Sequence, residues 1–100
     1  MTTWTFLSHH AQVFLCIAQD PDTRLRDIAA GVGITERAVQ AIVNDLVDAG
    51  YVDRARVGRR NHYAIHPEMP LRHPLQGDLD AGTLLRLLGE QSDDVGRGTL

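Results

Sequence analysis

Residues 25–46 constrain the fold of this 100-residue chain more than any other segment, because they hold two adjacent helical patterns separated by a glycine. In the first pattern, apolar residues recur at the i, i+3, i+4, i+7 spacing of one helical face. They are Leu25, Ile28, Ala29 and Val32. Gly33 follows at once, and glycine readily adopts the positive φ with which many helices end. Thr35 is a candidate N-cap, since its side-chain oxygen can accept a backbone N–H. The segment predicts two short helices joined by a tight turn.

The second helix is predicted over residues 35–49, with Gly50 as its C-cap. Its apolar residues gather on one side of a helical wheel, which must face the core. They are Val39, Ile42, Val43 and Leu46. The other side offers polar or small side chains, namely Arg37, Gln40, Ala41 and Asn44. Arginine can bond guanine, glutamine or asparagine can bond adenine, and a small alanine can touch a thymine methyl. These side chains predict either a DNA-reading face or an ordinary solvated face.

Residues 51–66 form a short basic ribbon in a chain whose net charge is −3. Within it, four arginines stand against Asp53, a local charge of +4 − 1 = +3. The arginines are Arg54, Arg56, Arg59 and Arg60. β-favouring residues flank the polar sequence 58–61, which predicts a hairpin with a glycine-containing turn. A concentrated positive patch is what phosphate contact requires, although an isolated ribbon of this kind could also be a merely solvated hairpin.

The remaining segments complete a small helical domain. His9–Gln19 has helical apolar spacing with Ser8 as N-cap, and the sequence Asp20-Pro21-Asp22 ends it, because proline cannot continue a helix. Prolines 67, 70 and 74 predict an irregular linker over the surface. Asp78 or Asp80 is expected to cap a final leucine-rich helix. Its leucines are Leu79, Leu84, Leu85, Leu87 and Leu88.

The predicted fold is therefore mainly α with a small β-hairpin (α+β): a three-helix core, a wing and a C-terminal helix. We expect a winged helix-turn-helix DNA-binding domain over residues 1–77, a C-terminal helix for dimerisation over residues 78–91, and a frayed tail over residues 92–100. The final helix could instead cover the helix at residues 9–19 and complete the core of one subunit.

The segments LRDIAAGVGITERAVQAIVNDLVDAGYV and RARVGRRNHYAI resemble winged helix regulators of the MarR type (multiple-antibiotic-resistance regulators) and the ArsR type (arsenical-resistance repressors). This resemblance covers residues 25–65. It implies that the helix at residues 35–49 enters the major groove, and that the wing at residues 54–62 lies on the backbone or in the minor groove. The recognition-helix positions would be Thr35, Arg37, Ala38, Gln40, Ala41 and Asn44. The wing tip would be Gly58, Arg59 and Arg60. Many relatives have a basic side chain where this chain has Ala41.

The sequence thus predicts a sequence-specific transcriptional regulator that binds double-stranded DNA. We also expect a homodimer, because one small module buries little DNA surface. The alternative is a winged helix that binds protein and does not contact DNA. Aromatic residues near the N-terminus could line a small-molecule pocket at a dimer interface, although aromatics at helical spacing more often lie in the core. They are Trp4, Phe6 and Phe14. The sequence identifies no effector.

Other functional classes find little support in the sequence. The histidines and Cys16 have no compact metal-ligand spacing, so we expect no metal or other cofactor. Catalytic motifs such as a nucleophile elbow or a phosphate loop are missing, so an enzyme is not expected. A single cysteine fits a reducing cytosol. With no signal-like leader and no apolar run of about 20 residues, we expect a cytoplasmic protein without a membrane partner.

Overall fold

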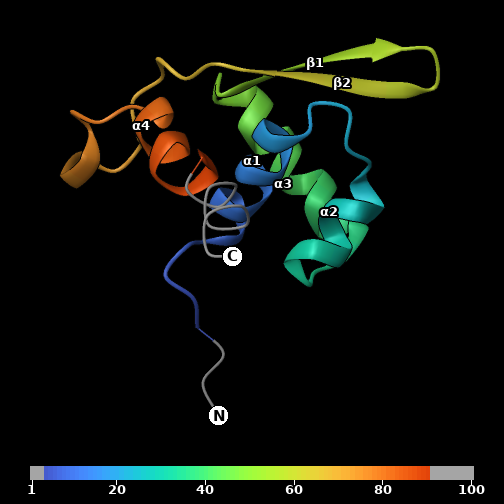
Figure 1. Cartoon of the computed structure of the whole chain (residues 1–100), viewed down its shortest axis with the longest axis horizontal. Helices are drawn as coiled ribbons and strands as arrows, with labels where there is room; N and C mark the ends of the chain where they lie inside the picture. The colour runs from blue at the N-terminus through green and yellow to red at the C-terminus, as the bar shows by residue number, and fades with distance from the viewer. Residues whose placement is uncertain (1–3, 91–100) are drawn as a thin grey trace, which may run out of the picture.

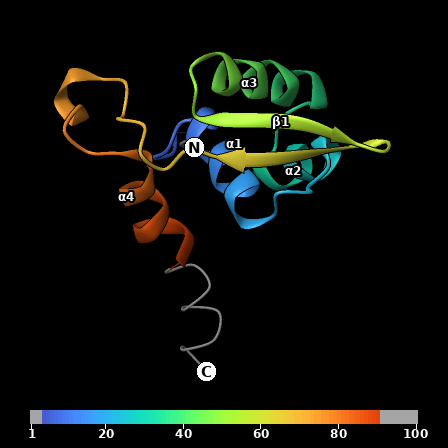
Figure 2. The same cartoon turned by 90° about the horizontal axis from the view of Figure 1, so that it is seen from above.

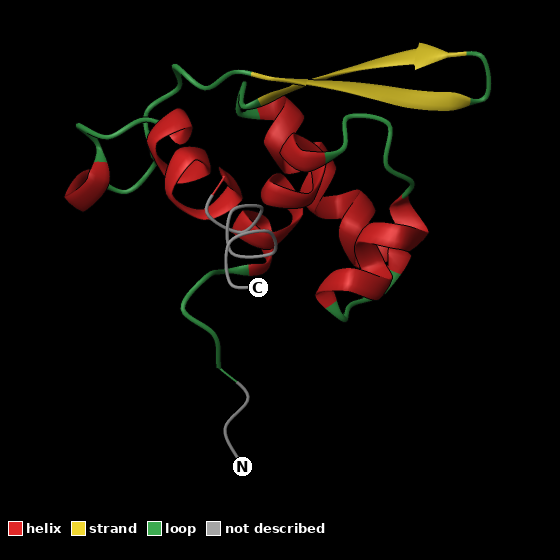
Figure 3. Cartoon of the chain, in the orientation of Figure 1, coloured by secondary structure: helices red, strands yellow, loops and turns green. Residues whose placement is uncertain are grey.

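Three helices, a hairpin and a short C-terminal helix follow one another in the computed structural model, which describes residues 4–90 (Figure 1). The helical elements are α1 (His9–Gln19), α2 (Leu25–Val32), α3 (Glu36–Asp48), a 3-10 turn (Pro74–Gln76), α4 (Ala81–Leu85) and a π-helical turn (Arg86–Glu90). The strands are β1 (Val52–Val57) and β2 (Arg60–Ile65), which pair in an antiparallel hairpin (Figure 3). The expected mainly helical fold with a small hairpin is confirmed.

The core lies between α1, α2 and α3 and continues to the base of the hairpin. Each helix contributes the apolar face that its spacing predicts. The buried residues are Val13, Phe14, Ile17, Ile28, Ala29, Val39, Ile42, Val43, Leu46, Tyr51, Val52, Tyr63 and Ala81. Phe14 meets the ring of Tyr51 edge-on, so it is a core residue. Trp4 and Phe6 contact each other and are 67% and 94% exposed, so the three aromatics line no common pocket.

The helix ends use the predicted capping residues, with one difference. Ser8 Oγ accepts the Ala11 backbone N–H at 3.1 Å, and Thr35 Oγ1 accepts that of Ala38 at 3.0 Å. Gly33 ends α2 in the left-handed conformation, with a φ of 87°. At the end of α3 the C-cap is Ala49, and Gly50 lies one residue beyond it with a φ of 87°. Gly50 therefore has the left-handed conformation that a helix-ending glycine often adopts, but it lies one residue beyond the C-cap.

The hairpin is longer than the β-favouring residues suggested. Val57 pairs with Arg60, so the turn contains only Gly58 and Arg59, and the predicted turn residue Asn61 lies in β2. Gly58 has a φ of 63°, which fits the first position of a two-residue type II′ turn. Because the strands extend through the arginine-rich residues, the tip of the hairpin reaches past the start of α3 (Figure 2).

The segment between β2 and α4 is not a simple linker. Pro70 and Asp80 form an isolated antiparallel bridge, and Leu71 N–H donates to the carbonyl of Leu79 at 2.9 Å. Ala81 N–H donates to the carbonyl of Met69 at 2.8 Å. These backbone contacts close a loop that returns the chain to the core, where Ala81 is buried at the start of α4.

The C-terminal helix begins later than predicted. Asp80 is its N-cap, and the backbone N–H and hydroxyl of Thr83 donate to its carboxylate, which lowers the pKa of that carboxyl. Leu79 therefore precedes the helix, and Asp78 does not cap it. The continuation through Glu90 is a π-helical turn that packs against α1. The predicted tail at residues 92–100 lies outside the described residues. Among the described helices, none has the length and apolar character needed to cross a bilayer.

Candidate nucleic-acid interface

The exposed face of α3 carries the side chains that the sequence predicts for DNA contact. Burial of the opposite face in the core leaves Arg37, Ala41 and Asn44 exposed, while Gln40 is half-buried. Thr35 stands exposed at the start of the helix, where its hydroxyl is already used as the cap. The face is thus available along the whole length of α3.

The hairpin runs alongside α3, and its tip lies at the same end of the molecule as the start of that helix (Figure 2). All four of its arginines are exposed, together with Gly58 at the tip. Arg56 bends toward the turn, where its Nε donates to the carbonyl of Gly58 at 3.4 Å. The helix and the hairpin therefore form two arms at one surface, one carrying amide groups and the other carrying positive charge.

A chain of polar contacts joins the two arms. Asn44 Oδ1 accepts a hydrogen bond from Gln40 Nε2 at 3.1 Å and another from Arg54 Nη1 at 3.0 Å. Three of the predicted contact residues, two on α3 and one on β1, thus lie together. Sequence spacing places Gln40 and Asn44 on neighbouring turns, but the link to Arg54 depends on how the hairpin packs.

The arginine charges at this surface are not neutralised by carboxylates. Across residues 4–90, no arginine side chain lies within 4.0 Å of an aspartate or glutamate oxygen; the close pairs all involve histidines. Guanidinium groups retain their charge at any physiological pH. They are therefore free to meet an anionic partner.

Two further arginines, which the sequence did not single out, lie close to the wing. A cleft of about 500 Å³ opens between the start of α2 and the hairpin tip, and its lining includes Arg24, Arg26, Arg59 and Arg60. Glu36, the first residue of α3, also lines this cleft. Arg24 and Arg26 flank Leu25 at the start of a predicted helix. They were not predicted from the sequence, because residues 1–50 have a net negative charge.

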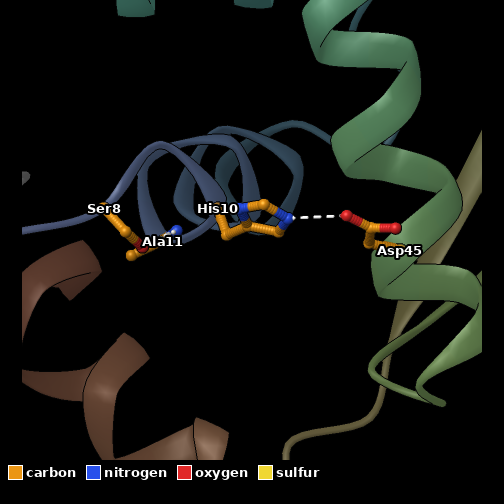
Figure 4. Close-up of polar contacts among 4 residues, drawn as sticks. All are labelled: Ser8, His10, Ala11 and Asp45. Carbon is orange, nitrogen blue, oxygen red and sulfur yellow. Dashed lines mark hydrogen bonds and ion pairs between the residues drawn. The ribbon is translucent and has the colours of Figure 1, made fainter.

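Histidine–carboxylate pairs hold both arms to the domain. His10 on α1 points toward Asp45 on α3, with 2.8 Å between Nε2 and Oδ2 (Figure 4). His62 on β2 lies 2.7 Å from Asp22 in the loop between α1 and α2. Next to this pair, Tyr63 N–H donates to the carbonyl of Pro21 at 2.9 Å. The hairpin is therefore attached along β2.

Two further features of the described residues are the arrangement of metal-ligand side chains and the burial of polar groups. Among residues 4–90, no three histidine, cysteine, aspartate or glutamate side chains group closely enough to hold a metal ion. In the same range no polar or charged residue is buried. Cys16 is half-buried, and this burial raises the pKa of its thiol, which favours the unreactive protonated form.

Comparison with known proteins agrees with this geometry. Residues 12–53, which include most of α1 and all of α2 and α3, match the model of the winged helix-turn-helix DNA-binding family. This segment is therefore similar to winged helix-turn-helix DNA-binding domains, and the expected resemblance to winged helix regulators is confirmed. None of the curated proteins matches the chain.

Solved structures share the fold at low sequence identity. FabT of Streptococcus pneumoniae, crystallised in complex with DNA, has a TM-score of 0.59 and 18% identity, over 97% of this chain and 65% of FabT. PcaV, a transcriptional regulator from Streptomyces coelicolor solved with its natural ligand, has a TM-score of 0.55 and 20% identity, over 95% of this chain and 72% of PcaV.

A third structure is CymR, the global cysteine regulator of B. subtilis, with a TM-score of 0.50 and 16% identity, over 95% of this chain and 88% of CymR. These likenesses show that the fold is shared, and this chain spans less than two thirds of the length of FabT.

Proposed function

We propose that the protein is a sequence-specific transcriptional regulator that binds double-stranded DNA. In this proposal α3 enters the major groove, while the hairpin lies on the backbone or in the minor groove. The observation that carries it is the pairing of an exposed amide-bearing helix with a hairpin whose arginines are unmatched by carboxylates in residues 4–90. The likeness of the fold to FabT, whose crystal structure contains DNA, supports the same function.

The contact residues divide by chemistry. We assign base contacts to Arg37, Gln40 and Asn44, and close approach to Ala41, because these are exposed or half-exposed along one face of α3. Phosphate contacts fall to Thr35 and to the wing. The wing residues are Arg54, Arg56, Gly58, Arg59 and Arg60. The cleft adds Arg24 and Arg26 as further phosphate contacts.

A homodimer completes the proposal. Leu87 is 56% exposed on the C-terminal helical segment, although Ala81 is buried and Leu85 packs against the core. The segment therefore covers its own domain and still offers apolar surface to a second subunit. A dimer would present two copies of α3. A palindromic site requires two such helices, because its half-sites lie one duplex turn (about 34 Å) apart. A DNA partner also implies the compartment that holds the DNA, in agreement with the expected cytoplasmic location.

Binding of the purified protein to random duplex DNA over a range of salt concentrations tests the partner class. We expect log affinity to fall linearly with log salt, because phosphate contact releases counterions. A winged helix that binds only protein would not need arginines in its wing, and it would show no such binding. Absence of salt-dependent binding would therefore favour the protein-binding alternative.

A further inference from the structure

The two hydrogen bonds that converge on Asn44 limit what this residue can offer to DNA. Its Oδ1 atom lies 3.1 Å from Gln40 Nε2 and 3.0 Å from Arg54 Nη1. An amide oxygen has two lone pairs, and both are directed to partners within the protein. The residue thus satisfies its acceptor capacity before any DNA arrives.

Donor chemistry fixes the orientation of both amides. An arginine guanidinium only donates, and an amide nitrogen only donates, so the Asn44 atom that faces Arg54 must be the oxygen. The Gln40 atom that faces this oxygen must in turn be its nitrogen. The orientation of both amide groups therefore follows from the position of Arg54 on β1.

The groups left available are different at the two positions. Asn44 keeps the two N–H donors of its Nδ2, which have no hydrogen-bond partner among residues 4–90. Gln40 keeps its Oε1 acceptor and one N–H donor. A bidentate contact with adenine needs one acceptor and one donor from the same amide. Gln40 meets that requirement in this arrangement, and Asn44 does not.

We infer that Asn44 contacts DNA only as a hydrogen-bond donor, an inference that rests on the proposed function. Arg54 is the positioning residue, because its guanidinium occupies the Asn44 oxygen. The partner of Asn44 on the base edge must be an acceptor: O6 or N7 of guanine, N7 of adenine, or O4 of thymine. The bidentate adenine contact belongs to Gln40. The wing therefore determines base choice at a position that its own side chain does not contact.

Base analogues test the donor-only contact. Sequences are selected from a random duplex pool with the wild type and with Asn44→Ala. The base pair that Asn44 contacts is the position at which the wild type shows a base preference and the variant does not. At that pair, removing the major-groove acceptors should weaken wild-type binding roughly tenfold, because a polar group is left unpaired. Replacing an adenine there by 2-aminopurine, which removes the 6-amino donor, should have no effect. A loss on removal of the amino donor would overturn the inference, because the oxygen of Asn44 would then be bound to DNA.

Wing variants test the positioning residue. Arg54→Ala should broaden base preference at the Asn44 position, because the freed oxygen can accept from adenine or cytosine, and Arg54→Lys should restore the preference by supplying a donor. Arg56→Ala is the matched control, since it removes one wing arginine that does not contact Asn44. It should weaken binding to all sequences equally. If Arg54→Ala behaves like Arg56→Ala, Arg54 is only a phosphate contact and the inference is wrong.

The same selection separates failure of the inference from failure of the proposed function. A wild-type protein that enriches no sequence would overturn both. If the wild type enriches a clear site and Asn44→Ala leaves the base preference at every position unchanged, Asn44 contacts no base. That result would overturn the inference and leave the proposed function intact.

Discussion

Gly33 donates its backbone N–H to the carbonyl of Ala29 at 2.8 Å while its own φ is 87°, and this contact ends α2 at the turn that leads into α3. The Ile34 N–H donates to the same carbonyl at 3.1 Å. The direction in which α3 leaves the turn therefore depends on a left-handed residue, a conformation that side chains with a Cβ adopt at a cost.

Gly33→Ala should lower the free energy of unfolding by about 1–2 kcal/mol, because alanine is strained at this φ even though nothing crowds its Cβ. Gly31→Ala is the matched control. Its added Cβ meets open space inside α2, where alanine is the better helix former, so stability should rise by about 0.5–1 kcal/mol. Urea denaturation measures both. Equal effects at the two positions would show that the turn does not require the left-handed conformation.

Arg59→Ala combined with Arg60→Ala should weaken binding to all DNA sequences about equally. Both side chains lie at or beside the hairpin tip, where contacts go mainly to phosphate. Losing two such contacts should flatten the slope of log affinity against log salt by roughly 2 units. An unchanged slope would mean that the wing does not touch the backbone.

Arg24→Ala combined with Arg26→Ala should also reduce the salt slope, by roughly 1–2 units, because the start of α2 faces the wing tip across the same cleft. Arg72→Ala serves as the control, since this exposed arginine lies in the loop between β2 and α4. Fluorescence anisotropy with a labelled duplex gives the slopes. Should the double variant match the control, the cleft takes no part in DNA binding.

Arg37→Ala should relax base preference at a particular position, at a cost of about 1–3 kcal/mol on the preferred site. The side chain is exposed in the first turn of α3, the part of a recognition helix that meets base edges. Affinities for the preferred site and for random DNA are compared for wild type and variant. Equal losses on both would identify Arg37 as a phosphate contact.

Leu87→Glu should weaken the homodimer at least tenfold without unfolding the domain, because Leu87 is 56% exposed and is not one of the buried core residues. This variant is preferable to truncation after Gly77, which would remove the buried Ala81. Leu75→Glu, at an exposed leucine on the 3-10 turn, is the control. Sedimentation equilibrium measures the dimer. A variant that dimerises as tightly as wild type would place the interface elsewhere, and a monomeric wild type would remove the dimer altogether.

Local signals were sufficient to predict the helical core. The caps at Ser8 and Thr35 and the glycine at residue 33 each act within a few residues, so the sequence indicates the helix starts and the turn directly. The exposed face of α3 follows from the same periodicity, because burial of one face determines the other.

Features that depend on contacts between distant segments could not be predicted in this way. The loop before α4 is closed by the bridge between Pro70 and Asp80, so Leu79 falls outside the helix that its leucine-rich neighbours suggested. Likewise, the approach of Arg24 and Arg26 to the wing, and of Arg54 to Asn44, depends on how the hairpin packs against the helices.

Selection of bound sequences from a random duplex pool by the full chain is the measurement that tests the central claim most directly. We expect enrichment of one short motif, arranged as an inverted repeat if the protein is dimeric, with affinity for that motif well above affinity for random DNA at every salt concentration. A pool that stays unenriched after repeated rounds, together with retention that does not depend on salt, would contradict the assignment of α3 and the hairpin as a DNA-reading surface.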